Sequence, residues 1–263
     1  MTTAPPPAEL LALAMEIARE AGVLLARRAG EARTRVATKS TSTDMVTEVD
    51  HESEALIVAR LLAARPDDGL LGEEGSERTG ASGARWVFDP LDGTTNFLYG
   101  IPAFAVAIAA EVEGEVVAGV VHDAVHGETY SASLGGGAFV GARRLAVSRE
   151  SNLAHALVGT GFGYDAARRA AQARVLAHVL PRVRDIRRSG SAALDLCAVA
   201  CGRLDAYYES GLQPWDHAAG ALIVREAGGL TGWGNEMPGL PAPIVAAPSA
   251  LYAPLLALIA ASA

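Results

Sequence analysis

The chain opens with two segments whose apolar residues recur at helical spacing. Leu10 and Ile17 belong to a stripe that predicts a helix over residues 8 to 29. Charged residues interrupt this stripe, which indicates an amphipathic helix and not a signal peptide. A second stripe predicts a helix over about residues 47 to 64, closed by Pro66.

The middle of the chain changes to short apolar runs that are separated by glycines. β-branched residues such as Val116 and Val120 are frequent in these runs, and Gly114 and Gly127 stand between them. The pattern predicts an antiparallel sheet with short turns. The expected strands cover residues 86–89, 104–113, 115–123, 128–133 and 137–147.

Strands alternate with helices in the second half of the chain, which is typical of an α/β arrangement. No linker of low complexity separates this half from the first. We therefore expect two tightly packed halves, over residues 1–150 and 151–263. The expected strands of the second half cover 156–161, 204–209 and 244–247, and the expected helices cover 166–180, 190–201, 215–227 and a last segment from Ser249.

Composition narrows the class of protein. Half of the 263 residues are apolar, which is enough for a substantial core. The formal net charge is −8 and we find no basic run, so nucleic acid is not expected as a primary ligand. No stretch reaches the ~18 uncharged apolar residues of a membrane span. Cys197 and Cys201 lie in an apolar stretch and are typical of buried thiols, and we expect a cytoplasmic protein.

The densest chemical signal is a run from Asp89 to Thr95, placed where a strand ends and a short helix begins. Asp89 and Asp92 are spaced so that both carboxylates can converge on cations, and hard Mg²⁺ prefers oxygen ligands. The amides of Gly93 to Thr95 can receive phosphate oxygens at a helix N-terminus. The combination favours phosphoryl chemistry, although an isolated motif of this kind is equally compatible with a turn and a capped helix.

This run is one of several matching segments: Asp44–Asp50, Gly72–Gly75, Trp86–Phe97, Arg188–Asp195 and Pro214–Ala221. In these segments the chain resembles the inositol monophosphatase family, part of a superfamily with fructose-1,6-bisphosphatases and nucleotide 3′-phosphatases. The resemblance covers essentially the whole chain. It implies a layered α/β/α/β/α sandwich with the metals where the two halves meet.

The resemblance implies two to three Mg²⁺ ions per subunit. Glu73, Asp89 and the backbone carbonyl of Leu91 would hold one ion, while Asp89, Asp92 and Asp216 would hold a second. A third, weaker ion would lie near Glu73 through water. Two cations suit in-line displacement, because one lowers the pKa of the attacking water and the other neutralises the leaving oxygen.

Catalytic and substrate-binding residues are also implied by the resemblance. Asp50 and Thr94 resemble a pair that orients water, Glu73 is expected to act beside them, and Lys39 resembles a lysine near the third ion. Glu209 resembles a carboxylate that accepts hydrogen bonds from ring hydroxyls. The expected substrate contacts are Gly93, Thr94, Thr95, Gly190, Ser191, Ala192, Glu209 and Asp216.

Several of these residues also have a purely structural interpretation. Glu73 can be a solvated acid of a glycine-rich loop, and Asp50 can face solvent on its helix. Asp216 can cap the helix that follows it. Glu209 can be a surface acid at the end of a strand.

Taken together, the segments favour a Mg²⁺-dependent phosphatase that hydrolyses myo-inositol 1-phosphate. Histidinol phosphate is an alternative substrate, because Glu209 can also meet an ammonium group. Fructose-1,6-bisphosphatase and nucleotide 3′-phosphatase activities are disfavoured, since no basic cluster is evident for a second phosphate or a nucleotide. A regulatory binding protein that acts through its surface is the alternative from another class. The resemblance further implies a homodimer and inhibition by Li⁺.

Overall fold

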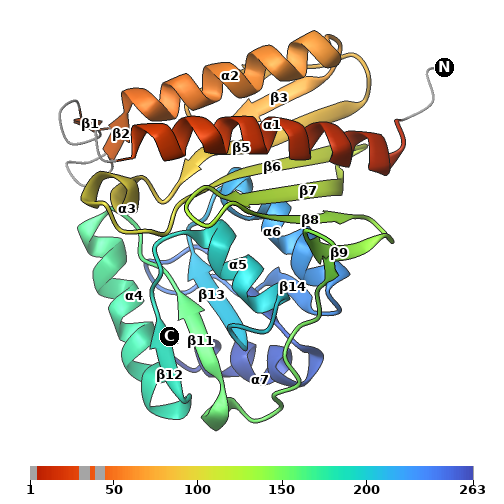
Figure 1. Cartoon of the computed structure of the whole chain (residues 1–263). Coiled ribbons are helices and arrows are strands. Elements are labelled where there is room, and N and C mark those ends of the chain that lie inside the picture. Colours follow the sequence, from red (N-terminus) through yellow and green to blue (C-terminus); the bar gives the residue numbers. More distant parts are fainter. Residues whose placement is uncertain (1–4, 30–35, 39–44, 263) are drawn as a thin grey trace.

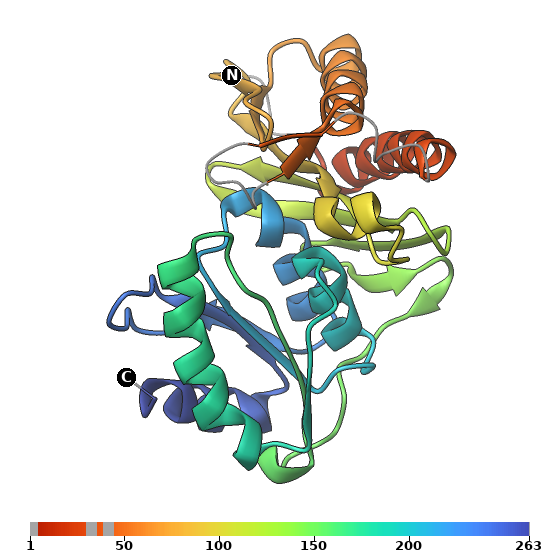
Figure 2. The ribbon, with the colours of Figure 1, turned by 90° about the vertical axis from the view of Figure 1, so that its left-hand side faces the viewer.

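Helix and sheet layers alternate through the molecule (Figures 1 and 2). Two helices cover the outer face of a large sheet, two more lie between this sheet and a smaller one, and two cover the far face of the smaller sheet. The predicted α/β/α/β/α sandwich is therefore confirmed. The structure is a computed structural model, and it describes residues 5–29, 36–38 and 45–262.

The outer layer consists of the two helices that the apolar stripes predict. They are α1 (Pro7–Arg28) and α2 (Glu48–Ala64). A proline in the first turn of α1 suits a helix start, because the N–H that it lacks would have no partner there. Leu10, Ile17 and Ile57 are fully buried in one apolar cluster with the large sheet.

The large sheet has the strand order β10-β9-β8-β7-β6-β5-β3-β4. All neighbours pair antiparallel except β3 and β5, which run parallel. The expectation of a purely antiparallel sheet is wrong at this pair, because the chain passes from β3 through the β4 hairpin before it returns. The strands are β3 (Gly69–Gly72), β4 (Glu77–Arg78), β5 (Ala84–Asp92), β6 (Ala105–Val112), β7 (Glu115–Asp123), β8 (Glu128–Ser133), β9 (Gly137–Val140) and β10 (Arg143–Arg144).

Two further predictions about this region need correction. The strand expected over 137–147 is divided into β9 and β10, since Gly141 turns the chain with a φ of 57° that suits glycine. The sequence also gave no sign of β1 (Val36–Thr38) and β2 (Met45–Thr47), which pair antiparallel in a sheet of their own. Strands this short carry too few residues to show an alternating pattern.

The large sheet is buried on both faces, but the two faces differ in side-chain size. Along β6, Ala105 and Ala107 face the inner helices, while Val106 and Ile108 face α1 and α2. Small residues on the inner face allow a helix to approach the sheet closely. The closest approach is at Gly119 of β7, where a Cβ atom would lie 2.9 Å from the carbonyl oxygen of Ala219.

The small sheet has the strand order β12-β11-β13-β15-β14. β11 pairs parallel with both β12 and β13, whereas β15 pairs antiparallel with β13 and β14. The sequence predicted the three central strands and missed the two edge strands. The strands are β11 (Leu157–Thr160), β12 (Asp185–Arg187), β13 (Ala206–Ser210), β14 (Leu230–Trp233) and β15 (Pro243–Ala247).

Four helices enclose the small sheet. The inner pair, α5 and α6, shares one apolar cluster with both sheets, and the outer pair, α4 and α7, forms a separate cluster with the far face. In the described residues, no helix combines the length and the apolar character needed to cross a membrane. The helices are α4 (Ala166–Val179), α5 (Ala192–Ala200), α6 (Pro214–Glu226) and α7 (Ser249–Ala260).

We expect Gly119→Ala to destabilise the protein, because the new methyl group would meet backbone atoms of α6 that cannot rotate away. Overpacking of this kind costs about 1–3 kcal/mol. The free energy of unfolding from urea titration measures the effect. Gly234→Ala is the control, because its Cβ would meet only side-chain atoms, at 3.1 Å or more. Equal stability of the Gly119→Ala variant and the wild type would contradict the close approach.

Candidate active site

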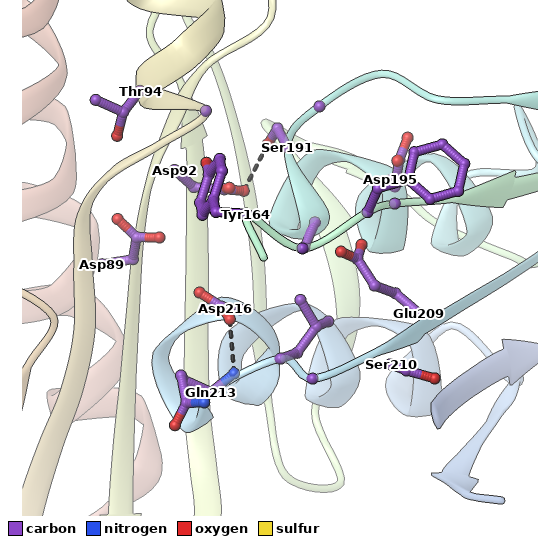
Figure 3. A pocket seen from close by; sticks show the side chains of 18 of the residues that line it. Asp89, Asp92, Thr94, Tyr164, Ser191, Asp195, Glu209, Ser210, Gln213 and Asp216 are labelled. Atoms are coloured by element: carbon purple, nitrogen blue, oxygen red, sulfur yellow. Dashed lines mark hydrogen bonds between the residues drawn. The ribbon is translucent and has the colours of Figure 1, made fainter. Parts of the chain in front are cut away.

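A cavity of about 370 Å³ lies where the end of β5 meets the loops that follow β11 and β13 (Figure 3). Because β11 and β13 are parallel neighbours, their carboxyl ends reach the same edge of the sheet, a common place for ligand sites. Asp50 and Thr95 are predicted site residues that do not line the cavity. Those that do are Glu73, Asp89, Leu91, Asp92, Gly93, Thr94, Gly190, Ser191, Ala192, Glu209 and Asp216.

The end of β5 is shaped to present two carboxylates. Asp89 is buried at 2% exposure, and its Oδ1 accepts a 2.9 Å hydrogen bond from the Leu91 N–H. The register of β5 against β6 shifts between Asp89 and Asp92, so both side chains can face the cavity. Gly93 follows with a φ of 95° and begins α3 (Thr94–Tyr99). No other residue fits there easily, because a Cβ would also lie 2.8 Å from the Ala103 carbonyl oxygen.

Three carboxylates from separate elements gather beside this turn. Glu73, Asp89 and Asp216 each offer an oxygen, and these atoms all lie within 4.8 Å of one another. Asp216 belongs to the first turn of α6, and its Oδ2 accepts a 2.6 Å hydrogen bond from the Gln213 N–H. Asp216 therefore supports the helix start from its third position, where Gln213 and not Asp216 is the N-cap, and it also joins the acidic cluster.

Asp92 is held by the start of α5. Its Oδ2 accepts hydrogen bonds from the Ser191 hydroxyl at 2.5 Å and from the Ala193 N–H at 2.8 Å. Ser191 in turn caps α5, since its Oγ accepts from the Leu194 N–H at 3.2 Å. One serine thus connects a predicted metal ligand to the predicted substrate loop.

Burial and the charges of neighbouring carboxylates raise the pKa values of Asp89, Asp92 and Asp216. Burial is the main cause of the raised pKa of Asp89, and the charges of Glu73, Asp92 and Asp216 add to it. Burial also raises the pKa of Asp216, followed by the charge of Glu73. The pKa of Asp92 rises to about 6 through burial, although the hydrogen bonds from Ser191 and Ala193 oppose the shift.

The donor set of this cluster fits a hard divalent cation. All of its ligand atoms are carboxylate oxygens, and the Leu91 carbonyl lines the same cavity. Oxygen ligands are those that Mg²⁺ prefers. A cation would also relieve the repulsion that adds to burial in raising the pKa values of Asp89 and Asp216.

Asp50 does not line the cavity, but its side chain lies within hydrogen-bonding distance of Thr94, which does. It is buried at 1% exposure on α2, so the interpretation of a solvent-facing acid is wrong. The Thr94 Oγ1 lies 3.1 Å from the Asp50 Oδ1 and 3.1 Å from the Leu91 carbonyl oxygen. A hydroxyl has one proton, so Thr94 can donate to only one of them at a time.

The opposite end of the cavity carries two further buried acids. Glu209 accepts a hydrogen bond from the Tyr207 hydroxyl, and burial raises its pKa to about 7. It lines the cavity, so the interpretation of a surface acid is wrong. Asp195 accepts from the Ser189 hydroxyl at 2.5 Å, and burial raises its pKa to about 7 as well.

Sequence reasoning missed several residues that line the cavity, and those with ionisable side chains include Tyr164, Arg168, Arg188 and Asp195. Asp195 ends one of the matching segments, so its position was a usable signal. The two arginines lie far apart in the chain, and for this reason no basic cluster was evident. Thr95, which was predicted to contact the substrate, does not line the cavity; its side chain hydrogen-bonds to Tyr164 instead. Lys39 and Asp44 lie outside the described residues.

Comparison with known proteins identifies the family to which this fold belongs. The model of the inositol monophosphatase family matches residues 7–261. The chain belongs to this family. The resemblance seen in the sequence is therefore confirmed, and membership makes the protein a phosphatase.

Individual relatives agree with this assignment. The inositol-1-monophosphatase SuhB of Mycobacterium tuberculosis is 49% identical over 240 residues, covering 84% of this chain and 83% of the relative. A relative from Pseudomonas aeruginosa, the Nus factor SuhB, is 45% identical over 231 residues, covering 84% of each chain. The crystal structure of the extragenic suppressor protein suhB from Bartonella henselae matches with a TM-score of 0.88 at 39% identity, covering 95% of this chain and 98% of that one.

We expect the rise in Tm on Mg²⁺ addition to grow with pH. The pKa of Asp92 is raised to about 6, so without metal its contribution to stability is present below its ordinary value of 3.8 and is lost as pH rises through 6. Mg²⁺ competes with protons for the carboxylates. Metal binding therefore stabilises the protein most at a pH where the carboxylates are already ionised. Melts with Mg²⁺ and with EDTA, from about pH 5.5 to about pH 7.5, measure the increment.

The difference between paired melts removes contributions that do not involve metal. His217 is one of these, because burial lowers its pKa to about 4 and its stabilisation is lost as pH falls from 6.5 towards that value. An increment that stays constant over the range would contradict the coupling of metal and protons at the acidic cluster.

We expect Asp216→Asn to separate metal binding from helix capping. The amide oxygen can still accept from the Gln213 N–H, while the charge is lost, so the metal-free variant should be as stable as the wild type or more so. Its Tm shift with Mg²⁺ should be smaller, and activity should fall by at least ~100-fold, about 2.7 kcal/mol. Thermal melts and phosphate release measure the two effects.

Asp216→Ala is the matched comparison. It removes the acceptor as well as the charge and should cost about 1 kcal/mol of stability relative to Asp216→Asn. A metal-induced shift that is unchanged in Asp216→Asn would show that this residue is a cap and no ligand.

Proposed function

We propose that the protein is a Mg²⁺-dependent phosphatase that converts myo-inositol 1-phosphate and water to inositol and phosphate. The observation that carries the proposal is the acidic cluster of Glu73, Asp89 and Asp216 beside the start of α3. Cation-binding oxygens and helix N–H groups lie side by side there, as phosphoryl transfer requires.

Within this proposal, each cation has its own ligands. Glu73, Asp89 and the Leu91 carbonyl would hold one ion, and Asp89, Asp92 and Asp216 a second, with a third more weakly near Glu73. When bound, such ions supply an activated water and neutralise charge on the leaving oxygen. The buried, mutually repelling carboxylates support this assignment.

The protein's own groups then position the reactants. The N–H groups of Gly93 to Thr95 would bind the phosphate oxygens. Thr94 would orient the attacking water with Glu73, and Asp50 would accept the Thr94 hydroxyl proton in a hydrogen bond, which turns the Thr94 oxygen lone pairs towards the water. Asp216 would contact the substrate on the side of the leaving oxygen.

The polyol ring would lie between the start of α5 and the end of β13. Gly190, Ser191 and Ala192 would line one side, and Glu209 would accept hydrogen bonds from ring hydroxyls. Asp195 adds a second buried acceptor at this end. Two carboxylates could also meet an ammonium group, so histidinol phosphate remains the alternative substrate.

A role outside catalysis is the second candidate. The Pseudomonas relative is named a Nus factor, which supports a regulatory function exerted through the protein surface. We also retain as predictions the division at residues 150 and 151, a cytoplasmic homodimer and inhibition by Li⁺. The homodimer and the inhibition by Li⁺ follow from the resemblance, whereas the division and the location follow from the sequence pattern and composition.

The proposed activity is tested by phosphate release with Mg²⁺ from inositol 1-phosphate, histidinol phosphate, fructose 1,6-bisphosphate and adenosine 3′,5′-bisphosphate. Among these four compounds we expect inositol 1-phosphate to have the highest kcat/KM. Glu73→Gln should abolish release, because it removes a ligand charge and an acceptor near the attacking water. A tenfold preference for histidinol phosphate would overturn the substrate assignment. If the Glu73→Gln variant kept more than a tenth of the wild-type kcat, Glu73 would not have the assigned role.

A further inference from the structure

The outer helix α2 carries three buried polar side chains on one face. Asp50, Ser53 and Glu54 lie at positions i, i+3 and i+4, so they leave the helix on the same side. Their exposed fractions are 1%, 0% and 5%. Polar groups this deeply buried need hydrogen-bond partners, and these three find them in segments around the acidic cluster. The Ser53 hydroxyl, for example, donates at 2.8 Å to the carbonyl oxygen of Pro90, which lies between two predicted metal ligands.

Glu54 holds the backbone of the loop that connects β3 to β4. Its Oε2 accepts a hydrogen bond from the Glu74 N–H at 2.9 Å, and its Oε1 accepts one from the Ser76 N–H at 2.9 Å. An ionised carboxylate has two acceptor oxygens and no donor, so one side chain can serve both N–H groups. Hydrogen bonds to a charged acceptor are also stronger than those between neutral groups. The loop over residues 73–76 is therefore attached to α2 at two points.

The Glu54 carboxylate lies directly against the chain that leads into Glu73. A Cβ atom at Gly72 would lie 2.7 Å from the Glu54 Oε2 and 2.6 Å from a ring carbon of Phe88. Only glycine therefore fits at the end of β3 without displacing one of these side chains. The Gly72 N–H also donates to the Ser76 carbonyl oxygen at 2.8 Å, which closes the loop on itself.

Glu73 differs from the other two carboxylates of the acidic cluster in where its backbone lies. Asp89 belongs to a strand and Asp216 to the first turn of a helix, whereas Glu73 belongs to the loop between β3 and β4. Its own N–H donates to the Phe88 carbonyl oxygen over 3.3 Å, which is long for a hydrogen bond. Mg²⁺ requires a near-ideal octahedral arrangement of its ligands. A ligand on a loop must therefore be fixed by contacts from outside that loop.

We propose that Glu54 is a positioning residue for the metal site, which fixes the loop of residues 73–76 from α2 and thereby sets the affinity of the acidic cluster for Mg²⁺. The proposal rests on the proposed function, because Glu73 must be a metal ligand. Groups that orient metal ligands from outside typically contribute roughly 10- to 100-fold to metal affinity. Glu54 does this through the backbone N–H groups that follow Glu73 in the chain.

Calorimetric titration with Mg²⁺, in the absence of substrate, tests the proposal on the whole protein. Glu54→Gln keeps the shape of the side chain but replaces one acceptor oxygen with an NH₂ group, which cannot accept from a backbone N–H. We expect the Kd for Mg²⁺ to rise at least about tenfold. Glu54→Asp keeps the charge and both oxygens but is one methylene shorter, so it should weaken Mg²⁺ binding as well. Wild-type affinity in Glu54→Asp would show that charge and not position matters, and would overturn the proposal.

Asp68→Asn is the matched control for a purely structural effect. Asp68 is a buried carboxylate at the opposite end of β3, with 1% exposure, and it accepts from the Trp86 Nε1–H at 2.9 Å and from the Ser82 hydroxyl at 2.6 Å. The chemical change is the same as in Glu54→Gln. We expect Asp68→Asn to lower the free energy of unfolding, measured by urea titration with EDTA, and to keep the wild-type Kd for Mg²⁺.

A double-mutant cycle shows whether Glu54 acts through Glu73. In a Glu73→Gln background, Glu54→Gln should not weaken Mg²⁺ binding to the remaining carboxylates any further, because the ligand that it positions is already lost. Equal weakening in both backgrounds, or an unchanged Kd in Glu54→Gln alone, would overturn the role of Glu54. A wild-type protein that binds Mg²⁺ but releases no phosphate from inositol 1-phosphate would overturn only the proposed function, while one that binds no Mg²⁺ would overturn both.

Discussion

Repulsion among closely spaced carboxylates is the constraint that the rest of the molecule must satisfy. Glu73, Asp89 and Asp216 come from three separate elements, yet their oxygens lie within 4.8 Å of one another. Like charges in a buried place oppose folding unless protons or cations balance them. The close contact of α6 with β7 holds Asp216 in place against this repulsion, because the backbone of Ala219 lies directly against Gly119. Metal binding and the stability of the inner helix layer are therefore linked.

Hydrogen bonds between distant segments align the predicted metal ligands of the cavity with the predicted substrate loop. Ser191 donates to Asp92, and Asn96 donates to the carbonyl oxygens of Ala103 and Ser189 at 2.7 and 2.8 Å. The end of β5 and α3 are thereby both joined to the loop before α5. A phosphate bound at the start of α3 and a ring bound beside α5 would be held in a fixed relation, which is what efficient phosphoryl transfer needs.

The parts of the structure that could be predicted are those with local signals. Long amphipathic stripes gave α1 and α2, and the spacing of Asp89 and Asp92 indicated the metal side. Edge strands such as β12 and β14 have only a few residues and show no period of their own. Arg168 and Arg188 could not be recognised as one feature, because Arg168 follows β11 and Arg188 follows β12, and only the parallel pairing of these two strands brings both to one cavity. Which strands pair with one another cannot be predicted from the local sequence pattern of either strand.

Because side-chain size differs between the two faces of β6, the two faces also differ in the substitutions that they tolerate. On the side of Ala105 and Ala107, growth by even a few atoms would push α6 away and carry Asp216 with it. On the side of Val106 and Ile108, large apolar residues can replace one another, since only the outer helices need to adjust. Selection on catalysis therefore acts on alternate residues of a strand that has no catalytic side chain, and drift is confined to the residues between them.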